Sequence, residues 1–134
     1  MPLDPALAGR VYPAGEPYLV SREKIREFAG ALGDSSRVHQ APPTFAVVVT
    51  LPAELRVVAD PELHFDLTRL LHREQRFEHR RAIEPGDELT VTVTIAAVDH
   101  VGGMDVLALM SEVRTTEGEL VCTGASTLIA RTDG

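Results

Sequence analysis

The stretch GDSSRVHQAPPTF, from Gly33 to Phe45, holds residue types that could do chemistry. It places Asp34 five residues before His39. A carboxylate and an imidazole that face one substrate are common partners in general acid–base catalysis. The same two residues also suit a plain connection, because an aspartate after a glycine is an ordinary turn former and a loop histidine is ordinary too. On residue types alone, both interpretations stay open.

This stretch lies between two predicted helices. The segment SREKIREFAGALG (21–33) predicts a helix with a serine N-cap, a glycine stop and apolar residues on one face. A second helix is predicted to begin at Pro42 or Pro43, where a missing N–H costs nothing, and to run through TFAVVVTLPAELRVV. It is apolar on nearly all sides, which predicts burial, and Pro52 is expected to kink or divide it.

In the second half of the chain, the spacing of apolar residues changes to the two-residue period of β-strands. From Leu89, LTVTVTIAAV alternates apolar residues with threonines, which is typical of a half-buried strand. MDVLALMSEVRT and LVCTGASTLIAR follow, and HREQRFEHRR precedes with a shorter strand pattern. Four consecutive strands joined by short turns predict an antiparallel sheet. Together with one long apolar helix, they predict a single α+β domain over residues 1–134, with the sheet wrapped around a central helix as in the hotdog fold.

Composition narrows the class of protein. Among 134 residues, 20 are acidic and 13 basic, the net charge is -7, and no basic run occurs, so nucleic acid is not expected as a partner. Cys122 is the only cysteine. We expect it to be a small core residue. A single cysteine allows no disulfide within the chain and is not typical of a metal site, and it favours a reducing, cytoplasmic setting. No segment approaches the roughly 20 apolar residues of a membrane span, and the N-terminus has no signal-peptide pattern, so we expect a soluble protein with no membrane partner.

Several of these segments coincide in one family. EFAGALGDSSRVHQ, APPTF, LLHREQRFEHRRAIEPGDELTVTVTI and STLIAR together resemble the MaoC-like dehydratase N-terminal domain family. In detail they are similar to small actinobacterial members related to the A and C subunits of the mycobacterial (3R)-hydroxyacyl-ACP dehydratase. The resemblance spans nearly the whole chain. Its most specific part is APPTF combined with His72, Gln75 and Phe77 in an H-x-x-Q-x-F pattern and with the following P-G-D-x-L.

The resemblance implies reversible addition of water to a trans-2-enoyl group carried on coenzyme A or acyl carrier protein, with no further cofactor. Asp34 and His39 match the family's acid and histidine at the family's spacing, and would form the catalytic pair. The start of the buried helix would stabilise the thioester oxygen, and its N–H donor is either supplied by Thr44 or missing. His72 and Gln75 would contact substrate or partner, or else serve as polar residues at a strand start, where Gln75 satisfies a backbone group.

The sequence departs from the family pattern in three places. Ser36 and Arg37 replace Asn-Pro, Pro43 stands where active members have a glycine that donates its N–H, and only Gln40 follows the histidine where the family has a longer segment. Two hypotheses therefore remain. The protein is a hydratase or dehydratase that works as a homodimer, or it is a non-catalytic substrate-binding subunit that pairs with a catalytic MaoC-type subunit. A hotdog thioesterase is a third, weaker alternative.

For the charged residues of the strand region, structural roles are favoured over ligand binding. Asp87, in PGDEL, is first of all a turn former. Arg76, Arg80 and Arg81 could receive the phosphates of coenzyme A or the acidic surface of a carrier protein, although a solvated strand face is the favoured interpretation. Because a wrapped sheet leaves an edge strand to cover, every hypothesis predicts pairing with a second hotdog subunit.

Overall fold

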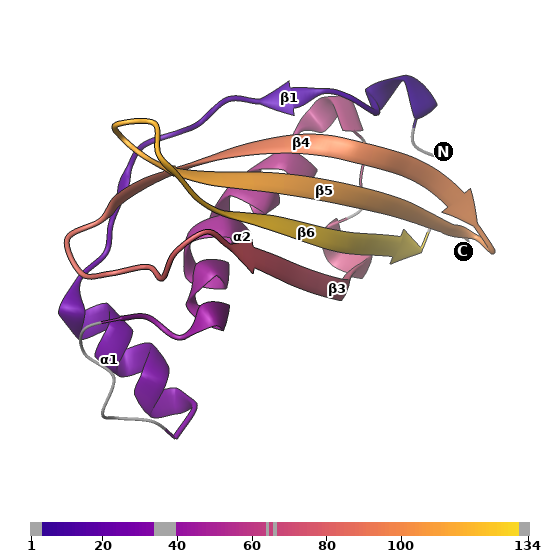
Figure 1. Ribbon diagram of the computed structural model, residues 1–134. Coiled ribbons are helices and arrows are strands. Elements are labelled where there is room, and N and C mark those ends of the chain that lie inside the picture. The colour runs from indigo at the N-terminus through magenta and orange to yellow at the C-terminus, as the bar shows by residue number, and fades with distance from the viewer. Residues whose placement is uncertain (1–3, 34–39, 64, 66, 132–134) are drawn as a thin grey trace.

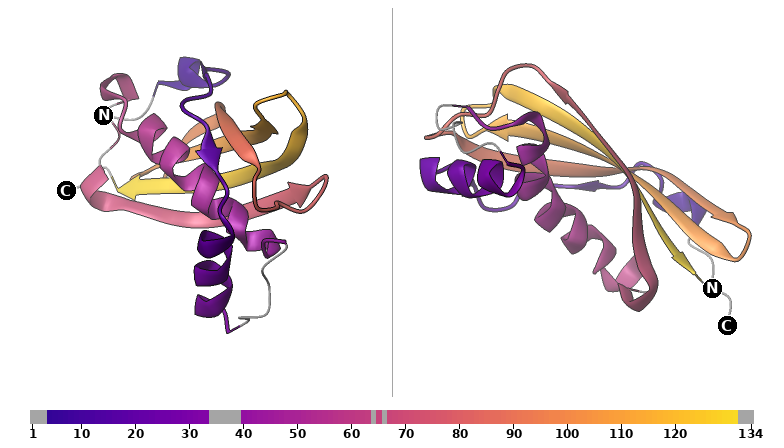
Figure 2. Two further views of the ribbon diagram at one scale, coloured as in Figure 1. Left: turned by 90° about the vertical axis from the view of Figure 1, so that its left-hand side faces the viewer. Right: turned by 90° about the horizontal axis from the view of Figure 1, so that it is seen from below.

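Two helices and a six-stranded antiparallel sheet make up the computed structural model, within the residues that it describes, 4–33, 40–63, 65 and 67–131. The helices are α1 (Arg22–Ala31) and α2 (Ala46–Val58). The strands are β1 (Val11–Tyr12), β2 (Tyr18–Leu19), β3 (Leu70–His79), β4 (Glu88–Val101), β5 (Met104–Thr115) and β6 (Leu120–Arg131). Short 3₁₀ turns occur at Pro5–Leu7, Pro43–Phe45, Pro61–Leu63 and Leu67–Arg69. The strands curve around α2, which lies across one face of the sheet (Figures 1 and 2).

Helix α1 confirms the first predicted helix. The Ser21 hydroxyl accepts a hydrogen bond from the backbone N–H of Lys24 at 3.0 Å, as an N-cap does. Ile25 and Ala29 form its buried face. Gly33 follows the helix with a φ of 86°, a left-handed conformation that favours glycine. The chain therefore turns out of the helix at the residue that the sequence marks as its stop.

Helix α2 is the buried centre of the domain. Its α-helical part begins at Ala46, and the predicted start at Pro43 is instead the first residue of the 3₁₀ turn Pro43–Phe45 that leads directly into it. The ring of Phe45 meets Phe28 of α1 edge-on with 5.4 Å between centroids. Pro52 does not divide the helix. It occupies an exposed position, where its missing N–H removes the bond to the carbonyl of Val48. The buried residues of α2 are Ala46, Val49, Thr50, Ala53, Glu54, Val57 and Val58.

The order of strands in the sheet is β1-β4-β5-β6-β3, and β2 pairs with β4 beside β1. The predicted meander is present in β4, β5 and β6, which follow one another across short turns. All four predicted strands are present in one antiparallel sheet, but β3 departs from the meander, because it pairs with β6 and not with its neighbour in the chain, β4. The reason is that β5 and the pair β1 and β2 occupy both edges of β4, so β3 finds its partner at the other end of the sheet.

Alternation along the strands places one face of the sheet against α2. Leu89, Val91, Val93 and Ile95 of β4 are buried, which confirms the period seen in the sequence. Cys122 of β6 is also fully buried, and this burial raises the pKa of its thiol to about 11. The interpretation of the cysteine as a small core residue is therefore confirmed.

None of the described helices is long and apolar enough to cross a membrane.

Candidate functional site

The inner face of β3 lies beside the start of α2. In the register of the sheet, Gln75 is opposite Ser126, Phe77 opposite Gly124 and His79 opposite Cys122. Ser126 and Cys122 are buried, so these alternate β3 residues share the face that covers α2. Strand β3 thus presents an amide, a phenyl ring and an imidazole toward the core.

Two hydrogen bonds hold the chain immediately before α2. The Nε2 atom of His79 lies 2.8 Å from the carbonyl oxygen of Pro43. The backbone N–H of Ala41 donates to the carbonyl of Ile83, also at 2.8 Å. Because one partner, His79, is the last residue of β3 and the other, Ile83, lies in the loop that follows it, the end of β3 and this loop fix the position at which the helix begins.

The helix start offers a backbone donor to solvent. Pro42 and Pro43 have no N–H, so the first N–H of the turn belongs to Thr44, which is exposed. The N-terminal end of a helix carries a partial positive charge, and its first N–H groups lack partners within the helix. An anionic oxygen can therefore be stabilised here. The predicted role of Thr44 as an oxyanion donor stays a prediction.

The predicted acid–base pair, Asp34 and His39, lies outside the described residues. On either side of this segment the structure describes Gly33, which follows α1, and Gln40, which precedes the bonded residue Ala41. The segment therefore runs from the end of one helix to the start of the next. The two predicted catalytic residues stay predictions.

The predicted contact residues of β3 differ in what can be said of them. His72 has its backbone opposite Leu128, and its side chain is outside the described part of the structure. The Nε2 atom of Gln75 donates a long hydrogen bond of 3.5 Å to the carbonyl of Ala125. Its Oε1 atom is buried and has no hydrogen-bond partner among the described residues. Gln75 thus reaches a backbone carbonyl with its nitrogen and keeps an acceptor free in the interior.

Two polar side chains near the core are not among the residues predicted for the site. His79 is half-buried, and its alternation with Gln75 and Phe77 is the signal that could have placed it on the inner face. Glu54, in α2, is fully buried. The hydroxyls of Ser126 and Ser111 donate to its Oε1 at 2.8 and 3.4 Å. This carboxyl belongs to the packing between α2 and the sheet.

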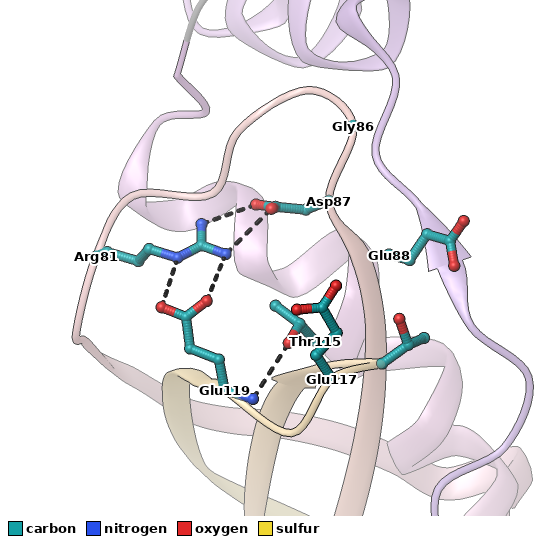
Figure 3. Close-up of a pocket in the computed structure, with 8 residues that line it drawn as sticks. Arg81, Gly86, Asp87, Glu88, Thr115, Glu117 and Glu119 are labelled. Atoms are coloured by element: carbon teal, nitrogen blue, oxygen red, sulfur yellow. Dashed lines mark hydrogen bonds and ion pairs between the residues drawn. The ribbon is translucent and has the colours of Figure 1, made fainter.

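A separate cluster of charges surrounds Arg81 where β3 leads into β4 (Figure 3). Its guanidinium contacts both carboxylate oxygens of Asp87, at 2.9 and 3.0 Å, and both of Glu119, at 3.2 and 3.3 Å. It also donates to the carbonyl of Ala82 at 2.9 Å. These bonds use all five N–H donors of an arginine. Arg81 is therefore already paired within the protein and keeps no donor for a phosphate.

The same cluster confirms Asp87 as a turn residue, because its carboxylate accepts the backbone N–H of Glu84 at 2.9 Å. Burial by itself raises the pKa of Asp87, but the hydrogen bonds from Arg81 and Glu84 outweigh it and hold the pKa below its ordinary value. Hydrogen bonds to Asp87 and Glu119 raise the pKa of Arg81. Arg76 is paired on the outer face with Glu74 at 3.2 Å, so it belongs to a solvated strand face, as favoured from the sequence.

Beside this cluster is a cavity of about 420 Å³ whose other charged residues are acidic. They are Asp87, Glu88, Glu117 and Glu119. Among the described residues, no group of three or more histidine, cysteine, aspartate or glutamate side chains is placed to hold a metal ion.

Comparison with known proteins gives a consistent result for family and relatives. The family model described as "FAS1-like, dehydratase domain region" matches residues 6–124. A UPF0336 protein of Saccharopolyspora erythraea is 43% identical over 145 residues, which cover 98% of this chain and 93% of that protein. A UPF0336 protein of Streptomyces coelicolor is 41% identical over 145 residues, with 98% and 97% covered. Both alignments are longer than the 134 residues of this chain, so these relatives carry residues that it lacks.

Solved structures show the same fold. A chain from the HadBC (3R-hydroxyacyl-ACP dehydratase) complex of Mycobacterium tuberculosis matches with a TM-score of 0.80 and 24% identity, over 97% of this chain and 100% of that chain. A MaoC-like dehydratase matches with a TM-score of 0.78 and 28% identity, over 95% of this chain and 43% of that chain. The sheet wrapped around a central helix is thus the predicted hotdog fold.

Proposed function

Because the chain belongs to the family of FAS1-like, dehydratase domain region proteins, we propose that it hydrates trans-2-enoyl thioesters and dehydrates (3R)-hydroxyacyl thioesters. The acyl group is carried on coenzyme A or on acyl carrier protein. Support comes from the family match and from the resemblance of its loop to an acid–base motif. Addition of water to a double bond changes no overall oxidation state, so the proposed reaction needs no redox cofactor.

In the proposed reaction Asp34 and His39 act as the acid–base pair. One of them takes a proton from water as its oxygen attacks C3, and the other gives a proton to C2, so that one water molecule is added across the double bond. In the reverse direction the two residues exchange these roles. Both steps require that the pair face the same edge of the substrate.

The thioester oxygen becomes negatively charged as C3 is attacked, and this charge needs donors that are already in place. We assign this role to the backbone N–H of Thr44, an exposed residue, and to the positive end of the helix dipole. The observation that carries the proposal is the bonding of this helix start to the end of β3, through His79 to Pro43, and to the loop after β3, through Ile83 to Ala41. A donor on a fixed support is worth more to a transition state than one that must be ordered first.

One observation favours the second candidate function, a non-catalytic subunit. Two consecutive prolines open the helix, so Pro43 offers no N–H where active members of the family have a glycine. The chain would then contribute its hotdog surface to a complex whose other subunit carries the full motif. The name of the HadBC complex, which refers to two subunits of one dehydratase, is consistent with such a division.

Both candidates include assembly with a second hotdog subunit. Strand β3 pairs with β6 on one side, and no described strand pairs with its other side. A free strand edge presents unpaired backbone groups that a second sheet can bond. We propose a homodimer for the active enzyme and a heterodimer with a MaoC-type subunit for the non-catalytic alternative.

Hydration of crotonyl-CoA and longer trans-2-enoyl-CoA substrates by the purified protein, followed by loss of the enoyl absorbance, tests the proposal. The enzyme hypothesis predicts turnover by the protein alone, and Asp34→Asn and His39→Ala should remove it. Equal turnover in the wild type and both variants would exclude the pair from the mechanism.

A second arm adds a MaoC-type protein from the same genome. Turnover that appears only in the mixture, and that is insensitive to Asp34→Asn, would favour the non-catalytic subunit. Turnover in the mixture that Asp34→Asn removes would instead assign the chemistry to this chain within a heterodimer.

A further inference from the structure

A second cavity, of about 180 Å³, lies on the flank of α2 that faces β4. The segment before β2 forms its third wall. Most of its lining is apolar, from the side chains of Tyr18, Val48, Val49, Pro52, Leu89 and Val91. The proposed reaction uses none of these residues. The cavity can therefore be judged as a site of its own.

One end of the cavity carries a cation. Arg56 lines it from the last turn of α2 and forms no ion pair within the described part of the chain. Its guanidinium lies against the backbone of Gly15, where an added Cβ would be 3.2 Å from Nη2. Several other arginines, such as Arg10 and Arg81, are paired with carboxylates. Among the described residues, no carboxylate therefore occupies the guanidinium donors of Arg56 at the mouth of this apolar space.

The cavity is apolar toward one end and cationic toward the other, because of the spacing of residues along α2. Val48, Pro52 and Arg56 follow one another at intervals of four residues, so they lie along one face of α2. With a rise of 1.5 Å per residue, this face extends over about 12 Å. Its first two positions are apolar and its third is a guanidinium. A ligand that matches this order has an extended alkyl chain and a negatively charged end.

We propose that this cavity binds a medium-chain aliphatic carboxylate, with the alkyl chain between α2 and β4 and the carboxylate on Arg56. A planar guanidinium binds both oxygens of a carboxylate at once, which gives this end group an advantage over a single hydroxyl. Burial of the methylene groups against Val48, Val91 and Leu89 supplies the apolar part of the affinity. This site goes beyond the proposed function, because it requires neither Asp34 nor His39.

Glu16 sets a limit on the affinity. It also lines the cavity, and it forms no ion pair with Arg56. Its carboxylate would repel that of the ligand, so Glu16→Gln should strengthen binding severalfold. The direction of this effect separates an anionic ligand from a neutral one.

Calorimetric titration of the purified protein with octanoate tests the site. We expect one site per chain and at least about tenfold weaker binding in Arg56→Gln, because this substitution removes the charged partner of the carboxylate. The matched control is Arg22→Gln on α1, which removes another exposed arginine without an ion pair in the described chain and should leave the affinity unchanged. Octanol should bind more weakly than octanoate, and equally to wild type and Arg56→Gln.

Two further variants test the geometry while keeping the charge. Gly15→Ala needs no unfavourable backbone angle but displaces the guanidinium, and it should weaken octanoate binding severalfold. Val48→Phe fills the apolar part and should weaken octanoate and octanol alike; thermal unfolding reports whether each variant is folded. The proposal is overturned if millimolar octanoate does not bind to the wild type, if Arg22→Gln and Arg56→Gln behave alike, or if octanoyl-CoA competes as well as octanoate. The last result would assign the cavity to the tail of an acyl thioester.

Discussion

The imidazole of His79, on the inner face of β3, is bonded to the carbonyl oxygen of Pro43 at the start of α2, with 2.8 Å between the two atoms. Because a carbonyl oxygen only accepts, Nε2 carries the proton in this bond. The other ring nitrogen, Nδ1, is buried and has no hydrogen-bond partner among the described residues. One side chain thus links the strand at the edge of the sheet to the place where the central helix begins.

Loss of this bond should loosen the helix start. We expect His79→Leu to lower the free energy of unfolding by about 1 kcal/mol, the usual net value of one hydrogen bond. Amide exchange at Thr44 and Phe45 should accelerate. His79→Gln, whose amide can donate, should recover part of both effects. Urea denaturation and hydrogen exchange measure them, and identical exchange in His79→Leu and wild type would show that the bond does not hold the helix start.

The cluster of Arg81 and Asp87 should make stability depend on pH. Asp87→Asn is expected to cost about 1–3 kcal/mol at neutral pH, because it removes one of the two carboxylates that pair with the half-buried guanidinium of Arg81 and leaves only Glu119. Glu88→Gln, in the same cavity but without an ion pair in the described chain, should change stability by less than about 0.5 kcal/mol.

The sign of the pH dependence follows from the lowered pKa of Asp87. Its unfolded value is near 3.8 and its folded value is lower. The carboxylate therefore contributes stability above the unfolded pKa and loses it as the pH falls through the folded pKa. At neutral pH, urea titrations should show the full difference in free energy of unfolding between wild type and Asp87→Asn. In strong acid the difference should vanish. A difference that persists in strong acid would contradict this account.

Two glycine substitutions should have opposite effects. A Cβ on Gly124, in β6, would lie 3.0 Å from Cε1 of Phe77, so Gly124→Ala should destabilise the protein by about 1–3 kcal/mol through overpacking. A Cβ on Gly30, in α1, meets no atom within 4 Å, so Gly30→Ala should stabilise by about 0.5–1 kcal/mol. Thermal and urea unfolding measure both. If Gly124→Ala were as stable as Gly30→Ala, the packing of Phe77 against β6 would be refuted.

The free edge of β3 should determine the oligomeric state. Leu71 lies on this strand with 59% of its surface exposed, and a charge there should hinder the approach of a second sheet. We expect Leu71→Asp to shift the sedimentation coefficient toward the monomer. Met110→Asp, at a 41% exposed position of β5 within the sheet, serves as control and should leave it unchanged. A wild-type protein that sediments as a monomer at micromolar concentration would contradict the proposed assembly.

Local patterns in the sequence were sufficient to predict the helices and the long strands. The cap at Ser21, the stop at Gly33 and the alternation after Leu89 each depend on neighbouring residues, so a single chain displays them. The pairing of β3 with β6 could not be predicted in this way, because it is decided by which strand edges remain free once β1 and β2 have paired with β4.

The site was less accessible to sequence analysis. Burial of Glu54 depends on hydrogen bonds from Ser111 and Ser126, which lie far along the chain. The residues next to Glu54 in the sequence give no signal for these partners. The contact between His79 and Pro43 likewise joins residues that only the folded sheet brings together. Asp34 and His39 were singled out by family resemblance, since an acid and a histidine in a loop are common by themselves.

The most direct test of the proposed chemistry is the kcat/KM for enoyl-CoA hydration of wild type, Asp34→Asn, His39→Ala and the double variant. If the two residues act as one acid–base pair, each single substitution should lower kcat/KM by about 10²–10⁴-fold. The double variant should then lose little more than either single one, because the pair works as a unit. Undiminished kcat/KM in the single variants, or a wild-type protein inactive both alone and with a MaoC-type partner, would contradict the proposed function.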